Sequence, residues 1–120
     1  MSFEKLGLCS EILKSIEEKG YVNPTEIQEE VIPILLGTKT DLIGLAQTGT
    51  GKTAAFGLPM LNSINPTKSE VQGLIIAPTR ELVQQIKKQL FNSILFKWDT
   101  YKRIRVSIYD GVCIINNPST

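Results

Sequence analysis

The chain of 120 residues contains no histidine and has only two cysteines, Cys9 and Cys113. Structural zinc sites use cysteine and histidine at close spacing, and these cysteines lie far apart, so we predict neither a zinc site nor a disulfide framework. The chain also lacks an excess of one charge, because it has 13 lysines and arginines and 12 acidic residues, which gives a net charge of +1. This balance gives no overall electrostatic footprint for nucleic acid or a membrane surface, so any polynucleotide contact must be local.

Long apolar runs are missing as well. Charged residues are scattered through the first twenty positions, which leaves no apolar core for a signal peptide. No later run is long enough to cross a bilayer. With 42% hydrophobic residues, the chain suits one modest domain but is short for a complete nucleotide-handling α/β domain. We therefore expect a cytoplasmic protein without membrane contact, whose two cysteines stay reduced.

A glycine-rich segment at 46–53 is the most informative feature that is present. It follows the apolar run 41–45 and matches the pattern G-x-x-x-x-G-K-[ST], except that Ala46 replaces the first glycine. A strand, a glycine-rich turn and a helix in this order direct backbone N–H groups and the positive end of the helix dipole at one spot, which suits a triphosphate. Lys52 would reach the β and γ phosphates, and the Thr53 hydroxyl would ligate Mg²⁺. The predicted nucleotide-binding residues are Ala46, Gln47, Thr48, Gly49, Thr50, Gly51, Lys52 and Thr53; the alternative is a helix-capping turn with a chance Gly-Lys-Thr.

Hydrophobic periodicity and capping signals predict helices and strands in alternation. Apolar runs predict buried strands at 41–46 and 73–77, and a third strand at 104–109 whose alternation is too weak to tell which faces are buried. The order of elements predicts an α/β fold, a parallel sheet of about three strands with right-handed crossovers, flanked by helices. Ligands of such sheets bind beyond the carboxyl ends of the strands, where the glycine-rich segment and residues 78–81 would both lie. Helices are predicted from a cap at Ser10 to a turn at Gly20, from Thr25 to Gly37 with Pro33 kinking it or ending it early, at 53–61, and from a cap at Thr79 through Leu90.

Three segments together resemble the N-terminal part of a DEAD-box ATP-dependent RNA helicase. Residues 20–28 read Gly-Tyr-Val-Asn-Pro-Thr-Glu-Ile-Gln and are similar to the family's Q motif. Residues 46–53 match the family's form of the phosphate loop, and 78–82 read Pro-Thr-Arg-Glu-Leu, like the segment that contacts the RNA backbone. The resemblance runs from Phe3 to about Gly111. It implies that 1–120 is the N-terminal part of a RecA-like ATP-binding domain, with the Q motif at 1–29 and a divergent tail at 112–120.

The resemblance implies ATP and Mg²⁺ as cofactors and adenine as the base. Gln28 would hydrogen-bond the adenine edge, since its amide offers a donor and an acceptor, and Tyr21 would supply an aromatic face near the base. Phe3 stands where the family keeps an upstream aromatic, and a role in the core is equally open. For Gln28 the alternative is a capping box, because Thr25-x-x-Gln28 is the pattern that ties down a helix start.

The resemblance also implies an RNA contact in the second half of the chain. In the family, the residues that correspond to Pro78, Thr79, Arg80 and Glu81 meet phosphate oxygens of RNA. Backbone contacts position a protein without reading bases, so binding to single-stranded or duplex RNA should be independent of sequence. The alternative is a helix cap at Thr79 followed by a solvated Arg-Glu pair.

Parts that phosphoryl transfer needs are absent from this sequence. In the helicase family, an Asp-Glu-Ala-Asp run and a second RecA-like domain supply the further carboxylates and the arginine. Asp110 ends the third predicted strand, but with Gly111 it resembles the family's Gly-Gly turn rather than a metal ligand. We expect Lys52 and Thr53 to hold catalytic positions, while the 120-residue chain binds ATP weakly and does not unwind RNA. A non-enzymatic adenine-nucleotide or RNA-binding module, or another P-loop enzyme such as a small-molecule kinase, remains an alternative.

Overall fold

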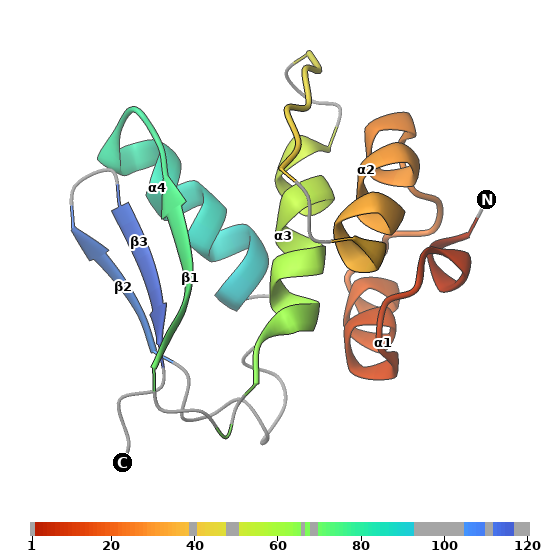
Figure 1. Cartoon of the computed structure of the whole chain (residues 1–120), viewed down its shortest axis with the longest axis horizontal. Coiled ribbons are helices and arrows are strands. Elements are labelled where there is room, and N and C mark those ends of the chain that lie inside the picture. The colour runs from red at the N-terminus through yellow and green to blue at the C-terminus, as the bar shows by residue number, and fades with distance from the viewer. Residues whose placement is uncertain are drawn as a thin grey trace. The chain divides into compact units, whose positions relative to one another are not determined.

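The computed structural model describes residues 2–38, 41–47, 51–65, 67, 70–92, 105–109 and 112–116, and of 91–92, 105–109 and 112–116 only the backbone. The chain divides into two compact units, Met1–Ser63 and Ile64–Thr120 (Figure 1). Among the described helices, none has the length and apolar character needed to span a membrane.

The first unit is helical. It contains a short 3₁₀ helix η1 (Phe3–Leu6) and the helices α1 (Ser10–Glu18), α2 (Glu26–Gly37) and α3 (Lys52–Ser63), and α3 packs against both α1 and α2. Helix α1 begins at Ser10 and its N-cap is Cys9, so the cap predicted at Ser10 is wrong by one residue. The chain leaves α1 through Gly20 at φ +93°, the left-handed turn that was predicted. The largest fully buried side chains described in this unit are Ile12, Ile16, Ile32, Leu58 and Leu61.

Prolines do not end the helices as the sequence suggested. Pro33 lies inside α2, and the helix continues for another turn to Gly37. Pro59 lies inside α3, where it is buried, and the helix continues to Ser63, beyond the predicted end at Leu61. A proline removes one helical hydrogen bond, and burial of the apolar faces of α2 and α3 against each other offsets that cost. We expected Pro33 either to kink α2 or to end it early, and the early end is wrong.

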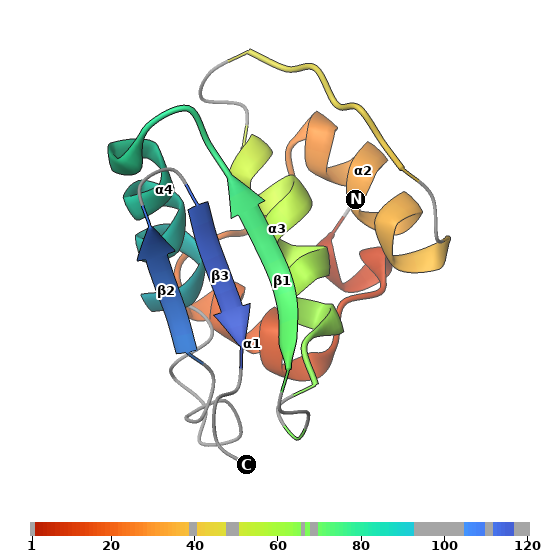
Figure 2. The same ribbon diagram turned by 60° about the vertical axis from the view of Figure 1, so that its left-hand side comes forward.

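Residues 41–47 were predicted to contain a buried strand, and this prediction is wrong. The segment has no regular secondary structure, and no strand in the described part of the chain pairs with it. Residues 43–45 are all exposed, Ile43 and Leu45 each to 90%, and only Leu42 and Ala46 are half-buried. A strand needs a partner for its backbone hydrogen bonds, and without one this apolar run stays extended and open to solvent. In Figure 2, residues 41–47 are the yellow segment after α2.

The second unit combines a sheet with helix. It contains β1 (Val71–Ile76), α4 (Arg80–Lys87), a π-helical turn η2 (Lys88–Asn92), β2 (Arg105–Tyr109) and β3 (Val112–Asn116). Helix α4 packs against β2 and β3, and its side chains Val83 and Ile86 are buried. Its start is as predicted, because Thr79 is the cap and its Oγ1 accepts a hydrogen bond from the Leu82 N–H at 3.2 Å.

The pairing in the sheet differs from the parallel arrangement predicted. The strand order is β1-β3-β2, and β3 is antiparallel to both neighbours (Figure 2). Only two residues separate β2 from β3, and a connection that short permits an antiparallel hairpin but no parallel crossover. Strand β3 covers much of the segment that we predicted to be a divergent tail, and it lies between the strands that correspond to those predicted at 73–77 and 104–109.

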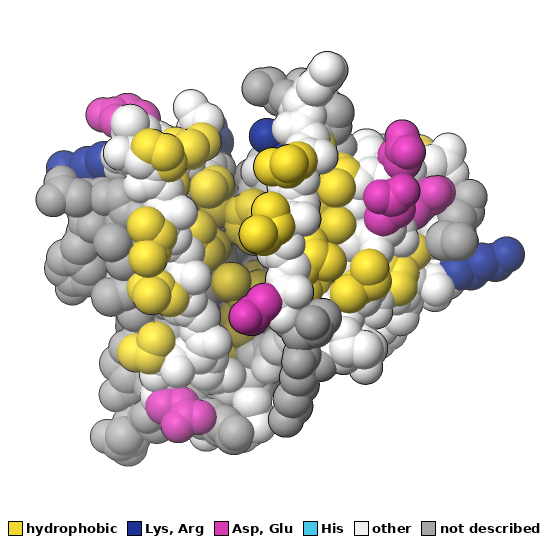
Figure 3. Space-filling view, turned by 45° about the horizontal axis from the view of Figure 1, so that its top comes forward, with side chains coloured by type: hydrophobic (Ala, Val, Ile, Leu, Met, Phe, Trp, Pro, Cys, Tyr) yellow, Lys and Arg dark blue, Asp and Glu magenta, His cyan; other side chains and the backbone are white. Residues whose placement is uncertain are grey.

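Strand β1 is also less buried than its apolar sequence predicted. Ile75 is buried, but Val71, Leu74 and Ile76 are 59%, 53% and 72% exposed. Strand β1 lies at the edge of the sheet, with β3 on one side only. Hydrophobic side chains are also exposed in the space-filling view of Figure 3.

Candidate functional site

The starts of α2 and α3 meet in the first unit. Thr25 and Gln28 form the capping box that begins α2, in which Gln28 Oε1 accepts a hydrogen bond from the Thr25 N–H at 3.0 Å. The capping role that the sequence left open for Gln28 is therefore observed.

The same side chain reaches the predicted phosphate loop. Gln28 Nε2 donates a hydrogen bond to the Gly51 carbonyl oxygen at 3.1 Å. That oxygen also accepts the first helical hydrogen bond of α3, from the Ala55 N–H at 3.2 Å. The Gln28 side chain is only 5% exposed, whereas its partner Gly51 is half-buried, so this hydrogen bond is partly shielded from water. The structure thus brings together the predicted Q motif and the phosphate loop through one carboxamide.

Gly51 is required at this position by its surroundings. Its φ is +85°, in the left-handed region that favours glycine. A Cβ placed there would collide with Gln28 Nε2 and lie 3.1 Å from Thr25 Oγ1. From the sequence, we expected glycine at position 51 because it lets the backbone approach phosphate oxygens. The structure adds a second reason, which is the short distance from this position to Gln28 and Thr25.

The residues after Gly51 form the first turn of α3. Lys52 is exposed, Thr53 is half-buried, and the alanines that follow are buried against the rest of the unit. Lys52 is thus the first residue of α3, the end of the helix where the positive end of its dipole lies. Thr48, Gly49 and Thr50, which we predicted to contact phosphate, lie outside the described residues.

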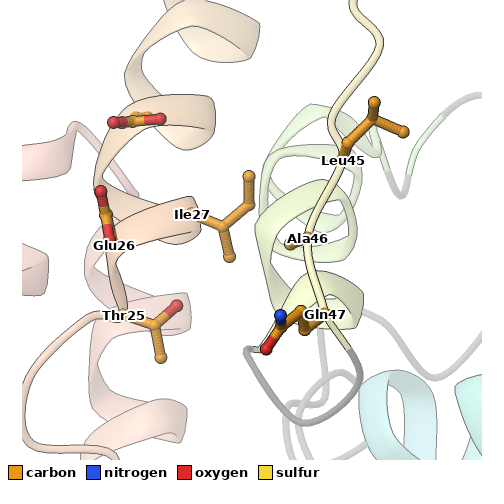
Figure 4. Close-up of a pocket in the computed structure, with 7 residues that line it drawn as sticks. Thr25, Glu26, Ile27, Leu45, Ala46 and Gln47 are labelled. Carbon is orange, nitrogen blue, oxygen red and sulfur yellow. The ribbon is translucent and has the colours of Figure 1, made fainter.

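A pocket of about 480 Å³ adjoins the beginning of the loop (Figure 4). The Ile27 side chain points from α2 toward the segment that carries Leu45 and Ala46. The residues that line the pocket include two carboxylates and no basic side chain, so the pocket would repel a negatively charged triphosphate. Its lining residues are Thr25, Glu26, Ile27, Glu30, Leu45, Ala46 and Gln47.

Of the lining residues, only Ala46 and Gln47 were predicted as site residues, and the carboxylates of Glu26 and Glu30 were not. They lie four positions apart in the sequence and so share one face of α2, which is the signal that could have indicated them. The contact between Gln28 and Gly51 was also missed. These residues are 23 positions apart, and no local pattern predicts such a pair.

The predicted aromatic residues also lie together. The rings of Phe3 and Tyr21 stack with centroids 6.5 Å apart and planes inclined by 23°. Phe3 is buried, in keeping with the core role left open for it, whereas Tyr21 is half-buried. Lys19 Nζ lies 5.5 Å from the Tyr21 ring centroid, a cation–π contact.

Cys9 behaves as a small packed side chain. Burial raises the pKa of its thiol, which favours the neutral form. Its backbone N–H donates to Asn62 Oδ1 at 2.7 Å and so ties the start of α1 to the end of α3. The described residues contain no group of three or more acidic or sulfur side chains arranged to hold a metal ion.

The predicted RNA-contacting residues lie in the second unit. Pro78, Thr79, Arg80 and Glu81 are all exposed, at the turn between β1 and α4. The cap at Thr79 followed by exposed Arg80 and Glu81 is the arrangement that the alternative interpretation predicted. Asp110 lies outside the described residues.

Comparison with known proteins decides the family. A model of the DEAD/DEAH box helicase family matches residues 25–114. The chain belongs to this family. The DEAD-box ATP-dependent RNA helicase CshA of Geobacillus kaustophilus is 48% identical over 111 residues, which cover 92% of this chain and 22% of that protein. The ATP-dependent RNA helicase CshA of Listeria monocytogenes is 48% identical over 109 residues, covering 91% and 20%.

Solved structures of DEAD-box proteins share the fold. S. cerevisiae Dbp5 bound to RNA and ADP BeF3 matches with a TM-score of 0.71 and 42% identity, covering 74% of this chain and 23% of that one. A DEAD box protein from Methanococcus jannaschii matches with a TM-score of 0.69 and 36% identity, covering 78% and 25%. This likeness confirms the predicted DEAD-box resemblance and the RecA-like class. The chain spans about a fifth of the length of the curated helicases that it matches.

Proposed function

We propose that this member of the DEAD-box family binds Mg²⁺-ATP where α2 and α3 begin, as the ATP-binding part of an ATP-dependent RNA helicase. The observation that carries the proposal is the hydrogen bond from Gln28 to Gly51, which joins the adenine motif of the family to its phosphate loop. Lys52 would neutralise the β and γ phosphates, and the backbone N–H groups of 47–53 would surround them. The relatives named above, which carry the name ATP-dependent RNA helicase, support the same activity.

Mg²⁺ would be held by the Thr53 hydroxyl and by phosphate oxygens of the nucleotide. This ion commonly takes one or two protein ligands, waters and substrate phosphates, so a single hydroxyl at the start of α3 fits it. When bound, the ion neutralises charge on the phosphates. Lys52 and Thr53 are the residues for which we propose catalytic positions.

Gln28 and Tyr21 would favour adenine over guanine. A carboxamide has two N–H donors and two acceptor lone pairs. One of each is used at Gly51 and Thr25, so the second donor and the second lone pair are the groups that would face the adenine edge. Tyr21 would offer its partly exposed ring to the base.

Residues Pro78 to Glu81 would contact the phosphates of RNA without reading its bases. Arg80 is exposed at the start of α4, where a side-chain cation and helix N–H groups both attract an anion. An Arg80→Ala variant should bind single-stranded oligonucleotides more weakly whatever their sequence, with a salt slope lower by about 1. Equal affinity and equal slope for both proteins would remove this part of the proposal.

Turnover should not accompany binding in the 120-residue chain, because the sequence has no Asp-Glu-Ala-Asp run. The test is a titration with a fluorescent ATP analogue. Lys52→Ala should weaken binding about thirtyfold, the equivalent of about 2 kcal/mol for a charged hydrogen bond. Lys5→Ala, which removes an exposed lysine of the same unit, is the matched control and should leave affinity unchanged. Equal affinity of the Lys52→Ala and wild-type chains would contradict the site.

A further inference from the structure

Residues 42–46 are an extended apolar segment that no strand accompanies. Within the described part of the chain, no hydrogen bond reaches the backbone of these residues and no strand pairs with them. The side chains of Ile43 and Leu45 are almost fully exposed. The segment therefore has the form and the side chains of a strand, and it lacks a neighbour that offers N–H and C=O groups.

Strand β1 offers such groups along one edge. It pairs with β3 on one side only, so the other side of residues 73–76 has no partner strand among the described residues. Edge strands are commonly protected by charged side chains, prolines or bulges. Strand β1 contains no charged residue and no proline, and its irregularity lies at the beginning, between Val71 and Gly73. With Leu74 and Ile76 exposed, this edge is open to an added strand.

The charge of the chain is divided unevenly between its two units. In Met1–Ser63 eight acidic residues outnumber five lysines, a net side-chain charge of −3, whereas in Ile64–Thr120 eight lysines and arginines outnumber four acidic residues, a net charge of +4. Two of the acidic residues, Glu26 and Glu30, line the pocket beside the segment 42–46. Pairing of two such segments, or of two β1 strands, would bring units of like charge together. Pairing of the segment with β1 of another copy brings units of opposite charge together.

We propose that this chain associates with a second copy of itself, by adding residues 42–46 of one copy as a strand to the free edge of β1 in the other. In the antiparallel register that sets Ile43 opposite Ile76, Leu45 lies opposite Leu74, and apolar side chains exposed in the single chain cover one another. Each copy carries both a segment and an edge, so the exchange is made twice and closes a two-fold dimer. The contact needs no nucleotide and does not depend on the proposed nucleotide site.

Sedimentation of the purified 120-residue chain without nucleotide tests the association and its electrostatics. The chain should show a monomer–dimer equilibrium. Raising the sodium chloride concentration should weaken the dimer about fivefold, because salt screens the attraction between oppositely charged units. Pairing between units of like charge would instead become tighter. A chain that stays monomeric at high micromolar concentration, or a dimer that tightens with salt, would refute the proposal.

Single substitutions locate the contact. Leu45→Lys changes the segment and Leu74→Glu changes the edge, and each should weaken the dimer at least about tenfold, because a charge then faces an apolar side chain at both contacts. The matched controls are Val22→Lys and Leu82→Glu, which place the same charges at exposed apolar positions of the same two units, outside the paired strands. They should change the dissociation constant by less than about threefold. Circular dichroism would confirm that each variant is folded.

An equal mixture of the Leu45→Lys and Leu74→Glu chains separates this pairing from the pairing of like strands. In the mixed dimer, one contact sets the introduced ammonium group opposite the introduced carboxylate, and the other contact is that of the wild type. The mixed dimer should therefore be about tenfold tighter than either variant with itself, as counted by native mass spectrometry. If Leu74→Glu does not fold, Ile43→Lys mixed with Ile76→Glu gives the same test at the neighbouring pair.

Three results would overturn the proposal. Undiminished dimerisation of Leu45→Lys alone would mean that β1 pairs with itself. Undiminished dimerisation of Leu74→Glu alone would mean that the segment 42–46 pairs with itself. A mixture of folded variants that forms no mixed dimer would mean that the segment and the edge do not meet.

Discussion

Replacing Gly51 by alanine should destabilise the first unit by more than backbone strain alone. A left-handed φ costs a residue with a Cβ about 1–2 kcal/mol. The new Cβ would also displace the Gln28 amide, which loses its bonds to Gly51 and to the Thr25 N–H, each worth about 1 kcal/mol. The expected total is about 3–4 kcal/mol, a large share of the stability of a typical domain.

Two controls separate the strain from the collision. Gly20 has a similar φ of +93°, and nothing lies within 4 Å of the point that a Cβ would occupy, so Gly20→Ala should cost the strain alone, about 1–2 kcal/mol. In a Gln28→Ala background the amide is gone, and Gly51→Ala should then cost about the same as Gly20→Ala. The free energy of unfolding of the wild type, the three single variants and the double variant would be measured by urea titration followed by circular dichroism. If Gly51→Ala costs the same with and without Gln28, within about 0.5 kcal/mol, the argument that the amide requires this glycine fails.

Other features of the chain give three further expectations. Thr79→Ala should destabilise α4 by about 1 kcal/mol while Thr79→Ser does not, as seen in thermal unfolding; equal effects would show that the hydroxyl does not cap the helix. In a Cys113→Ser background, Cys9 should react with iodoacetamide at about pH 8 more slowly than free cysteine, because burial raises its pKa and the thiolate forms only at higher pH; a faster reaction would contradict the packed thiol. Leu45→Lys should change the free energy of unfolding by less than about 0.5 kcal/mol and reduce self-association in light scattering, whereas a large destabilisation would mean that this exposed side chain is buried.

Local signals predicted the helices well. The caps at Thr25 and Thr79 and the turn at Gly20 were all found, because capping depends on residues within a few positions of one another. The second helix ran past Pro33 because packing between helices, which no local pattern records, outweighed one missing hydrogen bond.

Sheet pairing and the site contact could not be predicted in the same way. The apolar run at 41–47 has the composition of a strand, but a strand forms only with a partner, and none of the described strands pairs with it. At 112–116 the opposite happened, since a segment that we predicted to be a divergent tail forms the central strand of the sheet, and the family model extends into it as far as residue 114. For Gln28, the local pattern allowed two competing roles, capping and base recognition. The observed bond to Gly51 is a third, and it depends on how α2 and α3 pack.

The open segment at 41–47 has a consequence for the life of this polypeptide in a cell. Chaperones and quality-control proteases bind extended apolar segments, and in residues 41–47 the side chains of Ile43 and Leu45 are almost fully exposed. The lifetime of the chain in a cell should therefore depend mainly on how fast another strand covers residues 41–47. The stability of the helices that hold Gly51 should matter less.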